Sequence, residues 1–411
     1  MKNKAILFLS LIACLIFVLL LVFIFSNMGK RVPSSKAGCM PLNLTTIPSP
    51  MPQRKSYGSN IINPPSMPSW WKPQLNFLQQ IQLENISLKN SAPQDMVIYE
   101  DQVWIAYSES IIKNNSGKFS EYRIPIGTSK ENYLIEDLYV AKSSIMWVIL
   151  AGSSSSAIAR YDTVMDKFVV VTDKAGILNQ SGPLTWPSIP LAMSEMSNGS
   201  LVFTLGQEIF SYDPVNQQAQ KLLGLESGLR VDTLAVAKDD SIWFTTVNDF
   251  FIRSLDPVTG KINEHGEPPS LIRNEANQTG LARESSKAIT IDNNGGVWVG
   301  YFDRLEPDDK NGYFWQELDH SPIFVDIYDS EVYTYKWSPV ISVAQFSDGD
   351  LWFSAGVGVV QYSISKDSWC WVAPQPVPAT NTFSLIYEDE NGNIWMINMD
   401  ARLDQIYKLE Q

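Results

Sequence analysis

The sequence predicts an all-β protein, a seven-bladed β-propeller of four-stranded antiparallel blades preceded by one N-terminal transmembrane helix. Three observations predict it: a composition that favours strands, a short motif that recurs seven times, and one long apolar segment at the N-terminus. The 411 residues include thirteen Trp, sixteen Tyr and eighteen Phe, with 45% hydrophobic and 18% charged residues, as expected for strands around a large core. A closed all-β architecture can hold this length in one domain.

The N-terminal segment from Ala5 to Phe25 is apolar except for Ser10, about the length that a helix needs to cross a bilayer. Residues 1–26 are therefore expected to be a membrane anchor. Two alternatives stay open: a cleaved secretion signal, although no small-residue cleavage site is evident, and lipidation of Cys14, whose surroundings resemble a lipobox. Basic residues flank both ends of the segment, so charge alone does not orient it. We expect the large C-terminal part to lie outside the cytoplasm, as is typical of signal anchors.

Residues 27–74 contain nine prolines, which exclude helix and disfavour sheet. We predict a semi-extended stalk that lifts residues 75–411 from the bilayer. Of the three cysteines, Cys14 lies in the apolar segment, and Cys39 and Cys370 are expected to be free thiols, with a disulfide between them as the alternative in an oxidising compartment. The net charge of −13 and the absence of a basic cluster beyond the membrane flank argue against nucleic acid as a partner.

After the stalk, a turn rich in Asp, Asn and Gly is followed seven times by an alternating apolar strand with a central aromatic residue. The repeat length is at or above the roughly 40 to 50 residues of a propeller blade. Each unit continues with a third strand, an Asp turn and a fourth strand. We interpret the aromatic residues as anchors that fill the space between blades, rather than as an exposed ring that stacks on ligands. They are Trp104, Trp147, Phe203, Trp243, Trp298, Trp352 and Trp395.

The end of the chain predicts how the ring closes. Sixteen residues follow Trp395, which is room for a third strand but not a fourth. The alternating segment Leu75 to Glu84 is predicted to supply the outer strand beside Asp404 to Leu409, so that no edge is left exposed. The segments Asp292 to Gly296 and Asp389 to Asn393 resemble the opening of calcium loops but lack the distal Glu, so we interpret them as hairpin turns. No metal site and no cofactor are predicted.

These repeats resemble two families, the two-component-regulator propellers of bacterial sensor proteins and the streptogramin (virginiamycin B) lyases. The resemblance is strongest from Asp239 to Pro268 and covers roughly Pro93 to Gln411. The lyase resemblance implies metal-assisted ring opening of a cyclic peptide by histidines and a carboxylate on one face. The only histidines, His265 and His320, do not have the acid-x-His spacing of that site. Catalysis is therefore disfavoured, and the sensor resemblance implies ligand binding; such repeats specify a fold better than an activity.

Three intervals between anchors are longer than the others, with the excess at Thr172 to Leu191, Glu264 to Ser286 and Asp319 to Pro339. Each segment follows a fourth strand and precedes the next first strand, so all three are expected on one face. We predict that this face binds a protein, peptide or glycan. The alternatives are that the segments only cap the centre of the ring, or that the propeller is an adhesion or assembly scaffold. The candidate binding residues are Glu109, Asp249, Arg273, Arg283, Asp303, Arg304, Tyr328, Tyr333, Tyr335, Trp337 and Arg402.

Overall fold

The protein is described here by a computed structural model, and its described residues are all in strands and the connections between them. No helix among them is long and apolar enough to cross a membrane. The predicted anchor, residues 1–26, lies outside the described residues, as does the predicted stalk apart from residues 40–41. The described ranges are 40–41, 78–82, 93–100, 102–115, 118–124, 134–151, 156–171, 192–205, 207–226, 229–247, 251–266, 288–300, 302–308, 312–316, 340–355, 358–374, 383–389, 391–398 and 405–409.

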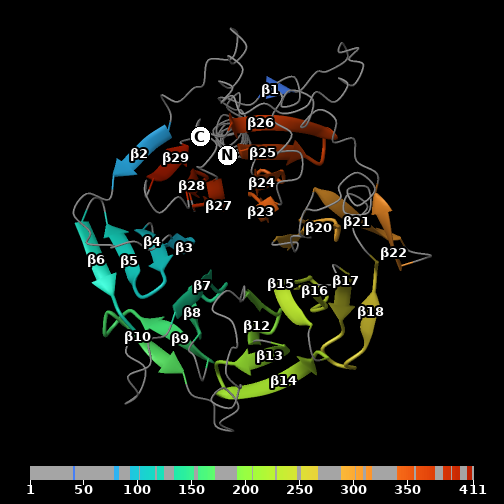
Figure 1. The fold of residues 1–411 in the computed structure, drawn as a ribbon, viewed down its shortest axis with the longest axis horizontal. Helices are drawn as coiled ribbons and strands as arrows, with labels where there is room; N and C mark the ends of the chain where they lie inside the picture. Colours follow the sequence, from blue (N-terminus) through green and yellow to red (C-terminus); the bar gives the residue numbers. More distant parts are fainter. Residues whose placement is uncertain are drawn as a thin grey trace, which may run out of the picture.

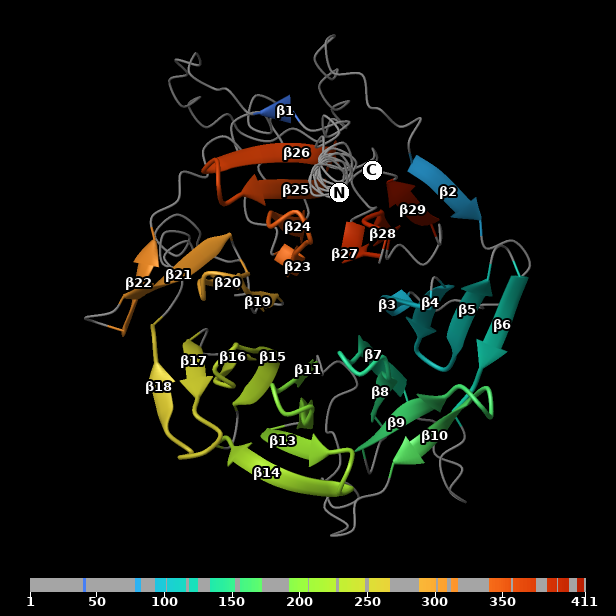
Figure 2. The same ribbon diagram turned by 180° about the vertical axis from the view of Figure 1, so that it is seen from behind.

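The described strands form seven antiparallel sheets arranged around a common centre, as Figures 1 and 2 show from opposite sides. We number these blades in chain order. Blade 1 comprises β3 (Pro93–Tyr99), β4 (Gln102–Tyr107), β5 (Ile111–Asn115) and β6 (Lys118–Tyr122), and blade 2 comprises β7 (Leu134–Val140), β8 (Met146–Ala151), β9 (Ser156–Asp162) and β10 (Lys167–Val171). Blade 3 comprises β11 (Met193–Glu195), β12 (Leu201–Leu205), β13 (Glu208–Asp213) and β14 (Gln218–Gly224), and blade 4 comprises β15 (Arg230–Val236), β16 (Ile242–Val247), β17 (Ile252–Leu255) and β18 (Ile262–Glu264).

The remaining three blades follow the same order from the inside of the ring outwards. Blade 5 comprises β19 (Ile289–Ile291), β20 (Val297–Val299), β21 (Asp303–Asp308) and β22 (Gly312–Gln316). Blade 6 comprises β23 (Val340–Gln345), β24 (Leu351–Ala355), β25 (Gly358–Ser363), β26 (Ser368–Pro374) and β1 (Met40–Pro41). Blade 7 comprises β27 (Phe383–Glu388), β28 (Ile394–Asn398), β29 (Gln405–Leu409) and β2 (Leu78–Gln82).

Two blades take a strand from the N-terminal part of the chain. In blade 7, β2 pairs antiparallel with β29 from Leu78 opposite Leu409 to Gln82 opposite Gln405, which is the predicted closure of the ring. Blade 6 corrects the prediction of uniform four-stranded blades. Six sheets have four strands, but the sheet of blade 6 has five because β1 adds to the outer edge of β26. The open N–H and C=O groups of an outer strand accept such an addition, and a proline is tolerated in an edge strand.

The connections between first and second strands are tight turns, as predicted. Asp292 Oδ1 accepts hydrogen bonds from the backbone N–H groups of Asn294 at 2.8 Å and Gly296 at 3.0 Å. Asp389 Oδ1 does the same in blade 7, from Asn391 at 3.0 Å and Asn393 at 2.8 Å. Both carboxylates thus organise hairpin turns. Gly295 and Gly392 have φ of 84° and 81° in these turns, a conformation that favours glycine.

Side chains from one blade also hold the turns of the preceding blade. Glu195, the last residue of β11, accepts a hydrogen bond from the backbone N–H of Lys142 in blade 2 at 2.6 Å. Glu388, the last residue of β27, accepts one from Ser347 N in blade 6, also at 2.6 Å. Gln345 has the same role toward Asn293 N, at 2.7 Å. Because these contacts cross between sheets, they fix the angle at which neighbouring blades meet.

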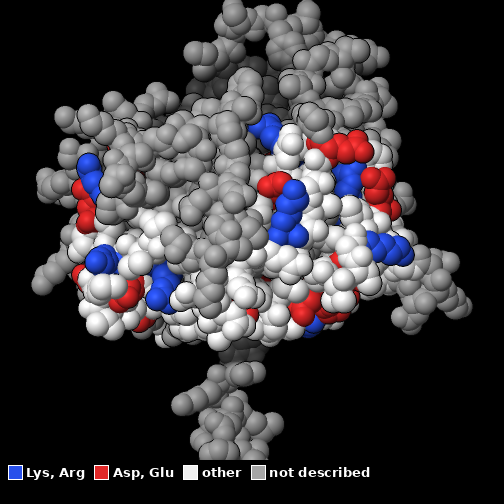
Figure 3. All heavy atoms as spheres, turned by 90° about the horizontal axis from the view of Figure 1, so that it is seen from below, with Lys and Arg blue, Asp and Glu red and all other residues white. Residues whose placement is uncertain are grey.

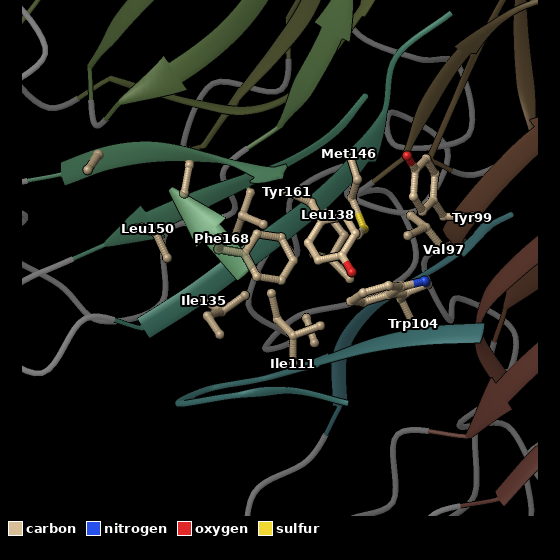
Figure 4. Close-up of a cluster of buried hydrophobic side chains, with 14 residues drawn as sticks. Val97, Tyr99, Trp104, Ile111, Ile135, Leu138, Met146, Leu150, Tyr161 and Phe168 are labelled. Carbon is tan, nitrogen blue, oxygen red and sulfur yellow. The ribbon is translucent and has the colours of Figure 1, made fainter. Parts of the chain in front are cut away.

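The core lies between the blades, and the seven predicted anchors are all buried, with exposed fractions from 0% to 9%. Trp104 of blade 1, for example, packs on Tyr161 and Phe168 of blade 2 (Figure 4). Phe203 needs a correction. It packs toward blade 2 with Trp147, whereas Val202 packs toward blade 4 in the way that Trp anchors pack toward their following blades. The structural equivalent of the Trp anchors in blade 3 is therefore Val202.

Candidate functional site

The inter-blade face is the side of the ring on which each fourth strand leads into the next first strand. The connections between second and third strands open on the same side, because successive strands in a blade are antiparallel. The long segments that we expected on this face lie outside the described residues, except for Glu264 to Gly266. The described part of the face therefore consists mainly of the beginnings of the inner strands and the connections between second and third strands.

Three of the predicted binding residues are described. Glu109 is exposed in the connection between β4 and β5. Asp303 and Arg304 begin β21 and are only 3% and 4% exposed, so both residues are packed inside the molecule. The other candidates lie outside the described residues: Asp249, Arg273, Arg283, Tyr328, Tyr333, Tyr335, Trp337 and Arg402.

Arg304 belongs to an ion-pair network inside blade 5. Its Nε and Nη2 atoms lie 2.9 Å and 2.8 Å from Asp292 Oδ2, which also accepts a hydrogen bond from the indole of Trp298 at 2.9 Å. Its Nη1 atom lies 2.5 Å from Glu306 Oε2, and the guanidinium stands 5.4 Å from the Trp298 ring centroid. A Cβ at Gly296 would come within 2.5 Å of Arg304 Nε. The glycine therefore leaves room for a paired, buried arginine.

A pair of aspartates on the inner strands was missed by the sequence analysis. Asp95 in β3 and Asp137 in β7 occupy equivalent positions, two residues before the residue that pairs with the Trp anchor. Asp95 Oδ1 accepts a hydrogen bond from its neighbour Met96 N at 2.7 Å. Asp95 Oδ2 accepts one from Leu138 N of the next blade at 2.6 Å. The available signal was an acidic residue inside each otherwise largely apolar inner strand.

The carboxyl groups of Asp95 and Asp137 are hydrogen-bonded to each other, an arrangement that needs one proton between them. Burial raises the pKa of Asp95 to about 6, against the lowering effect of hydrogen bonds from Asp137, Leu138 and Met96. Burial, and then the negative charge of Asp95, raise the pKa of Asp137 well above its usual range. These directions place the shared proton on Asp137, which donates to Asp95. Strongly perturbed carboxyl groups of this kind concentrate at functional sites.

The inner strands also bend where these aspartates lie. The pairing of the first and second strands is irregular near the beginning of β3, β7, β15, β23 and β27, and bulges of this kind redirect side chains. Arg230 begins β15 on the same face, and its Nη1 atom is buried with no hydrogen-bond partner among the described residues. The beginnings of the inner strands thus bring acidic and basic groups to one side of the ring.

His265 lies in the packing between blades 4 and 5. Its Nε2 is 2.9 Å from Ser254 Oγ, and its ring stacks on Trp243 with centroids 4.5 Å apart. Burial lowers its pKa. Among the described residues, no carboxylate bonds its other ring nitrogen, which a Ser-His-Asp arrangement would require. His320 lies outside the described residues. Within the described part of the chain, no three or more His, Cys, Asp and Glu residues are grouped to hold a metal ion.

The charged side chains on the side of the ring drawn in Figure 3 are interspersed. Lys and Arg stand beside Asp and Glu, with uncharged surface between them. Close pairs elsewhere among the described residues follow the same pattern, for example Lys221 with Glu208 at 2.6 Å and Arg123 with Glu121 at 3.0 Å. The described surface on this side therefore presents no large field of one sign.

No family model matches this chain, and no curated protein matches it in sequence. Solved propellers do match in structure. A catalytically inactive virginiamycin B lyase from Staphylococcus aureus with quinupristin has 15% identity and a TM-score of 0.54, over 81% of this chain and 99% of that one. The extracellular domain of a hybrid two-component system from B. thetaiotaomicron has 14% identity and a TM-score of 0.56, over 81% and 41% of the two chains.

A third structure, YCF48 bound to D1 peptide, has 12% identity and a TM-score of 0.55, over 83% of this chain and 96% of that one. The resemblance to lyase and two-component propellers predicted from the repeats is confirmed at the level of structure. At these identities the likeness shows the fold and leaves the activity open. What the chain shares with all three is the β-propeller architecture.

Proposed function

We propose that this protein is a non-catalytic binding or sensing propeller, tethered to the membrane by residues 1–26, with the propeller outside the cytoplasm. Its ligand binds on the inter-blade face. The observation that carries the proposal is the Asp95–Asp137 pair, two carboxyl groups with raised pKa on the inner strands near that face. Carboxyl groups with pKa values perturbed in this way cluster at functional sites, so a functional reason for the pair is favoured.

The comparisons support this type of function. The propellers of the two-component systems are extracellular domains. YCF48 was solved with a peptide and the lyase with quinupristin. Among protein, peptide and glycan ligands for this chain, we therefore place a peptide or protein segment first. The buried Arg230 Nη1 and the Asp95–Asp137 pair would supply the charged contacts, and the three long segments would supply contact area.

An assembly or adhesion scaffold is the alternative function. It is favoured by β1, which shows that the outer edge of blade 6 accepts an added strand. If outer edges of other blades accept strands of other chains in the same way, the protein would join partners without sensing a ligand. This role predicts binding at the outer rim, whereas sensing predicts binding on the inter-blade face.

The test uses the full chain in detergent micelles, screened against peptide and glycan libraries and extracts of the cell envelope. We expect a peptide or protein ligand whose affinity falls when Asp137→Asn is introduced or when one of the three long segments is shortened. Asp239→Asn, an exposed residue in a turn on the opposite face, is the matched control. A ligand whose affinity none of these changes affects would place the site elsewhere. Protease added to intact cells tests the orientation, because an extracytoplasmic propeller would be cleaved.

A further inference from the structure

Each blade carries a row of four residues, one from each strand, that lie side by side on the surface facing the following blade. The rows follow from the strand registers. In blade 5 the row is Thr290, Trp298, Arg304 and Gln316, and in blade 1 it is Val97, Trp104, Lys113 and Ser120. The second member is Trp in six blades. In blade 3 the row is Ser194, Val202, Ser211 and Gln220.

The missing indole in blade 3 coincides with aliphatic residues on the facing blade, in place of aromatic ones. The positions in blade 2 that receive Trp104 are Tyr161 and its partner Phe168. The equivalent pair in blade 4 is Leu255 and Ile262. Phe168 is 7% exposed, but Ile262 is 39% exposed. The interface between blades 1 and 2 thus has three aromatic rings, those of Trp104, Tyr161 and Phe168. The interface between blades 3 and 4 has three aliphatic side chains at the same positions, those of Val202, Leu255 and Ile262.

A cavity of about 620 Å³ opens at this interface, within the range of small-molecule and side-chain binding sites. Ser211 and Gln220, the third and fourth members of the blade 3 row, line it. Met196 from the first turn of blade 3 and Pro257 and Val258 from the outer turn of blade 4 also line it. These turns lie on the face opposite the inter-blade face. The cavity is therefore separate from the ligand site proposed above.

The residues that line the cavity indicate which chemical class of ligand it can bind. Met196, Leu222, Pro257 and Val258 give apolar contacts, and Asn198, Ser211 and Gln220 give neutral hydrogen-bonding groups. Among the described residues, no Lys or Arg lines the cavity, and the one charged residue that lines it is Asp213. An anionic ligand therefore has no cation to pair with. A flat ring with an N–H or O–H donor satisfies both kinds of wall.

We propose that this cavity binds an aromatic side chain of a peptide partner, with the ring beside Ser211 and Gln220, the outer half of the row whose second member is Trp in six other blades. A Trp or Tyr residue carries the ring and the donor. The amides of Asn198 and Gln220 are hydrogen-bonding groups available to the peptide backbone, and Val258, which lines the cavity, is 91% exposed. A glycan is the less suitable occupant, because no aromatic side chain among the lining residues stacks on a sugar ring.

The test measures binding of short capped peptides, Gly-Trp-Gly, Gly-Leu-Gly and Gly-Glu-Gly, to the full chain in detergent micelles by titration calorimetry. We expect the Trp peptide to bind about tenfold more tightly than the Leu peptide, a difference of ~1.4 kcal/mol, and the Glu peptide more weakly than both. Equal affinities for the Trp and Leu peptides would overturn the proposal. Tighter binding of simple sugars than of the Trp peptide would also overturn it.

Two substitutions locate the site. Ser211→Arg copies the arginines that blades 2 and 5 have at this row position, Arg160 and Arg304, and fills the cavity. Val258→Asp changes an exposed side chain that lines the cavity, without touching the core. Both substitutions should lower the affinity for the Trp peptide by about tenfold or more. Val215→Asp is the matched control, because Val215 occupies the same turn position in blade 3, is 87% exposed and does not line the cavity. If Val258→Asp and Val215→Asp have equal effects, the ring binds elsewhere.

Discussion

Two interfaces in the ring are built on the same strand registers but are filled differently. Between blades 1 and 2, Trp104 contacts Tyr161 and Phe168 of blade 2 with ring centroids 4.8 and 6.1 Å away (Figure 4). It also contacts Tyr122 of its own blade, with ring centroids 5.2 Å apart. Tyr122 and Tyr161 both donate hydrogen bonds to Asp166. Between blades 3 and 4, aliphatic side chains take the positions of Trp104, Tyr161 and Phe168, and a cavity remains.

The difference shows what holds a propeller together. The hairpins and the contacts between neighbouring turns set the register and angle of each blade, so the fold survives a poorly filled interface. Ser197 N, for instance, donates to Asp240 Oδ1 at 2.6 Å across blades 3 and 4. The side chains between the sheets then decide how much each interface stabilises. An interface with spare volume is available for binding, whereas a filled one is not.

The largest expected effect comes from removing the ring of Trp104, which is completely buried between blades 1 and 2. Trp104→Ala should lower the free energy of unfolding by ~3–5 kcal/mol, because the ring is fully buried and the cavity cannot collapse against rigid strands. Val202→Ala, at the equivalent position of blade 3, should cost roughly 1.5 kcal/mol from the lost apolar burial. Urea unfolding followed by Trp fluorescence and circular dichroism measures both. Equal losses would mean that the two interfaces do not differ in the way described.

The next largest effect concerns blade 5, where the buried ion pair of Asp292 and Arg304 fills the space beside Trp298. Asp292→Ala should lower the free energy of unfolding by about 3 kcal/mol, because it leaves Arg304 buried with only Glu306 as its ionic partner. Asp389→Ala removes an equivalent turn and indole contact in blade 7, where Lys408 replaces the arginine in the row. It should cost about 1 kcal/mol, as for a lost hydrogen bond. A larger loss for Asp389→Ala would contradict this ranking.

A pH experiment contrasts the inner strands of the same two regions. Asp95 and Asp137 have raised pKa in the folded protein, so the folded state binds the shared proton more tightly than the unfolded state. Their contribution to stability is therefore complete below pH ~4, the unfolded pKa of Asp, and is lost as the pH rises through about 6 and above. In blade 4 the equivalent residue is Thr233, which does not titrate.

Asp137→Asn should therefore flatten the fall in melting temperature between pH 4 and pH 7, with little difference from the parent protein near pH 4. Differential scanning calorimetry at a series of pH values measures this. Asp239→Asn, an exposed position on the opposite face, is the control variant measured in the same series. A variant at Asp137 that keeps the full slope would show that another group titrates.

The smallest expected effect is a gain. Ile262→Phe places a ring where blade 2 has Phe168 and should raise the free energy of unfolding by ~0.5 kcal/mol, because an exposed aliphatic side chain becomes a partly buried aromatic one. Val258→Phe is the control, at a turn position that is 91% exposed. Thermal unfolding of both variants measures the difference between their stabilities. If Ile262→Phe lowers the stability, the interface between blades 3 and 4 has no room for a larger side chain from blade 4.

The local pattern of the sequence was enough to predict the repeated unit. Asp and Gly turns with φ above zero, alternating apolar strands and a Trp in six of seven second strands are determined within single hairpins. The closure by β2 was also predictable, because the residues after Trp395 have room for a third strand only and the alternating segment Leu75 to Glu84 precedes the first unit. The site was less predictable, since eight of its candidate residues lie outside the described part of the chain.

The tertiary structure alone decided which face of a strand meets which blade. In "LVFTL", Val202 and Phe203 are both fully buried because both faces of a blade are covered, so alternation could not show which one takes the place of Trp. Arg304 looked like a surface cation until its carboxylate partners were placed around it. Asp95 and Asp137 are forty-two residues apart in sequence, and only the adjacency of two inner strands brings them together. Long-range neighbours of this kind depend on how sheets pack, which no single hairpin encodes.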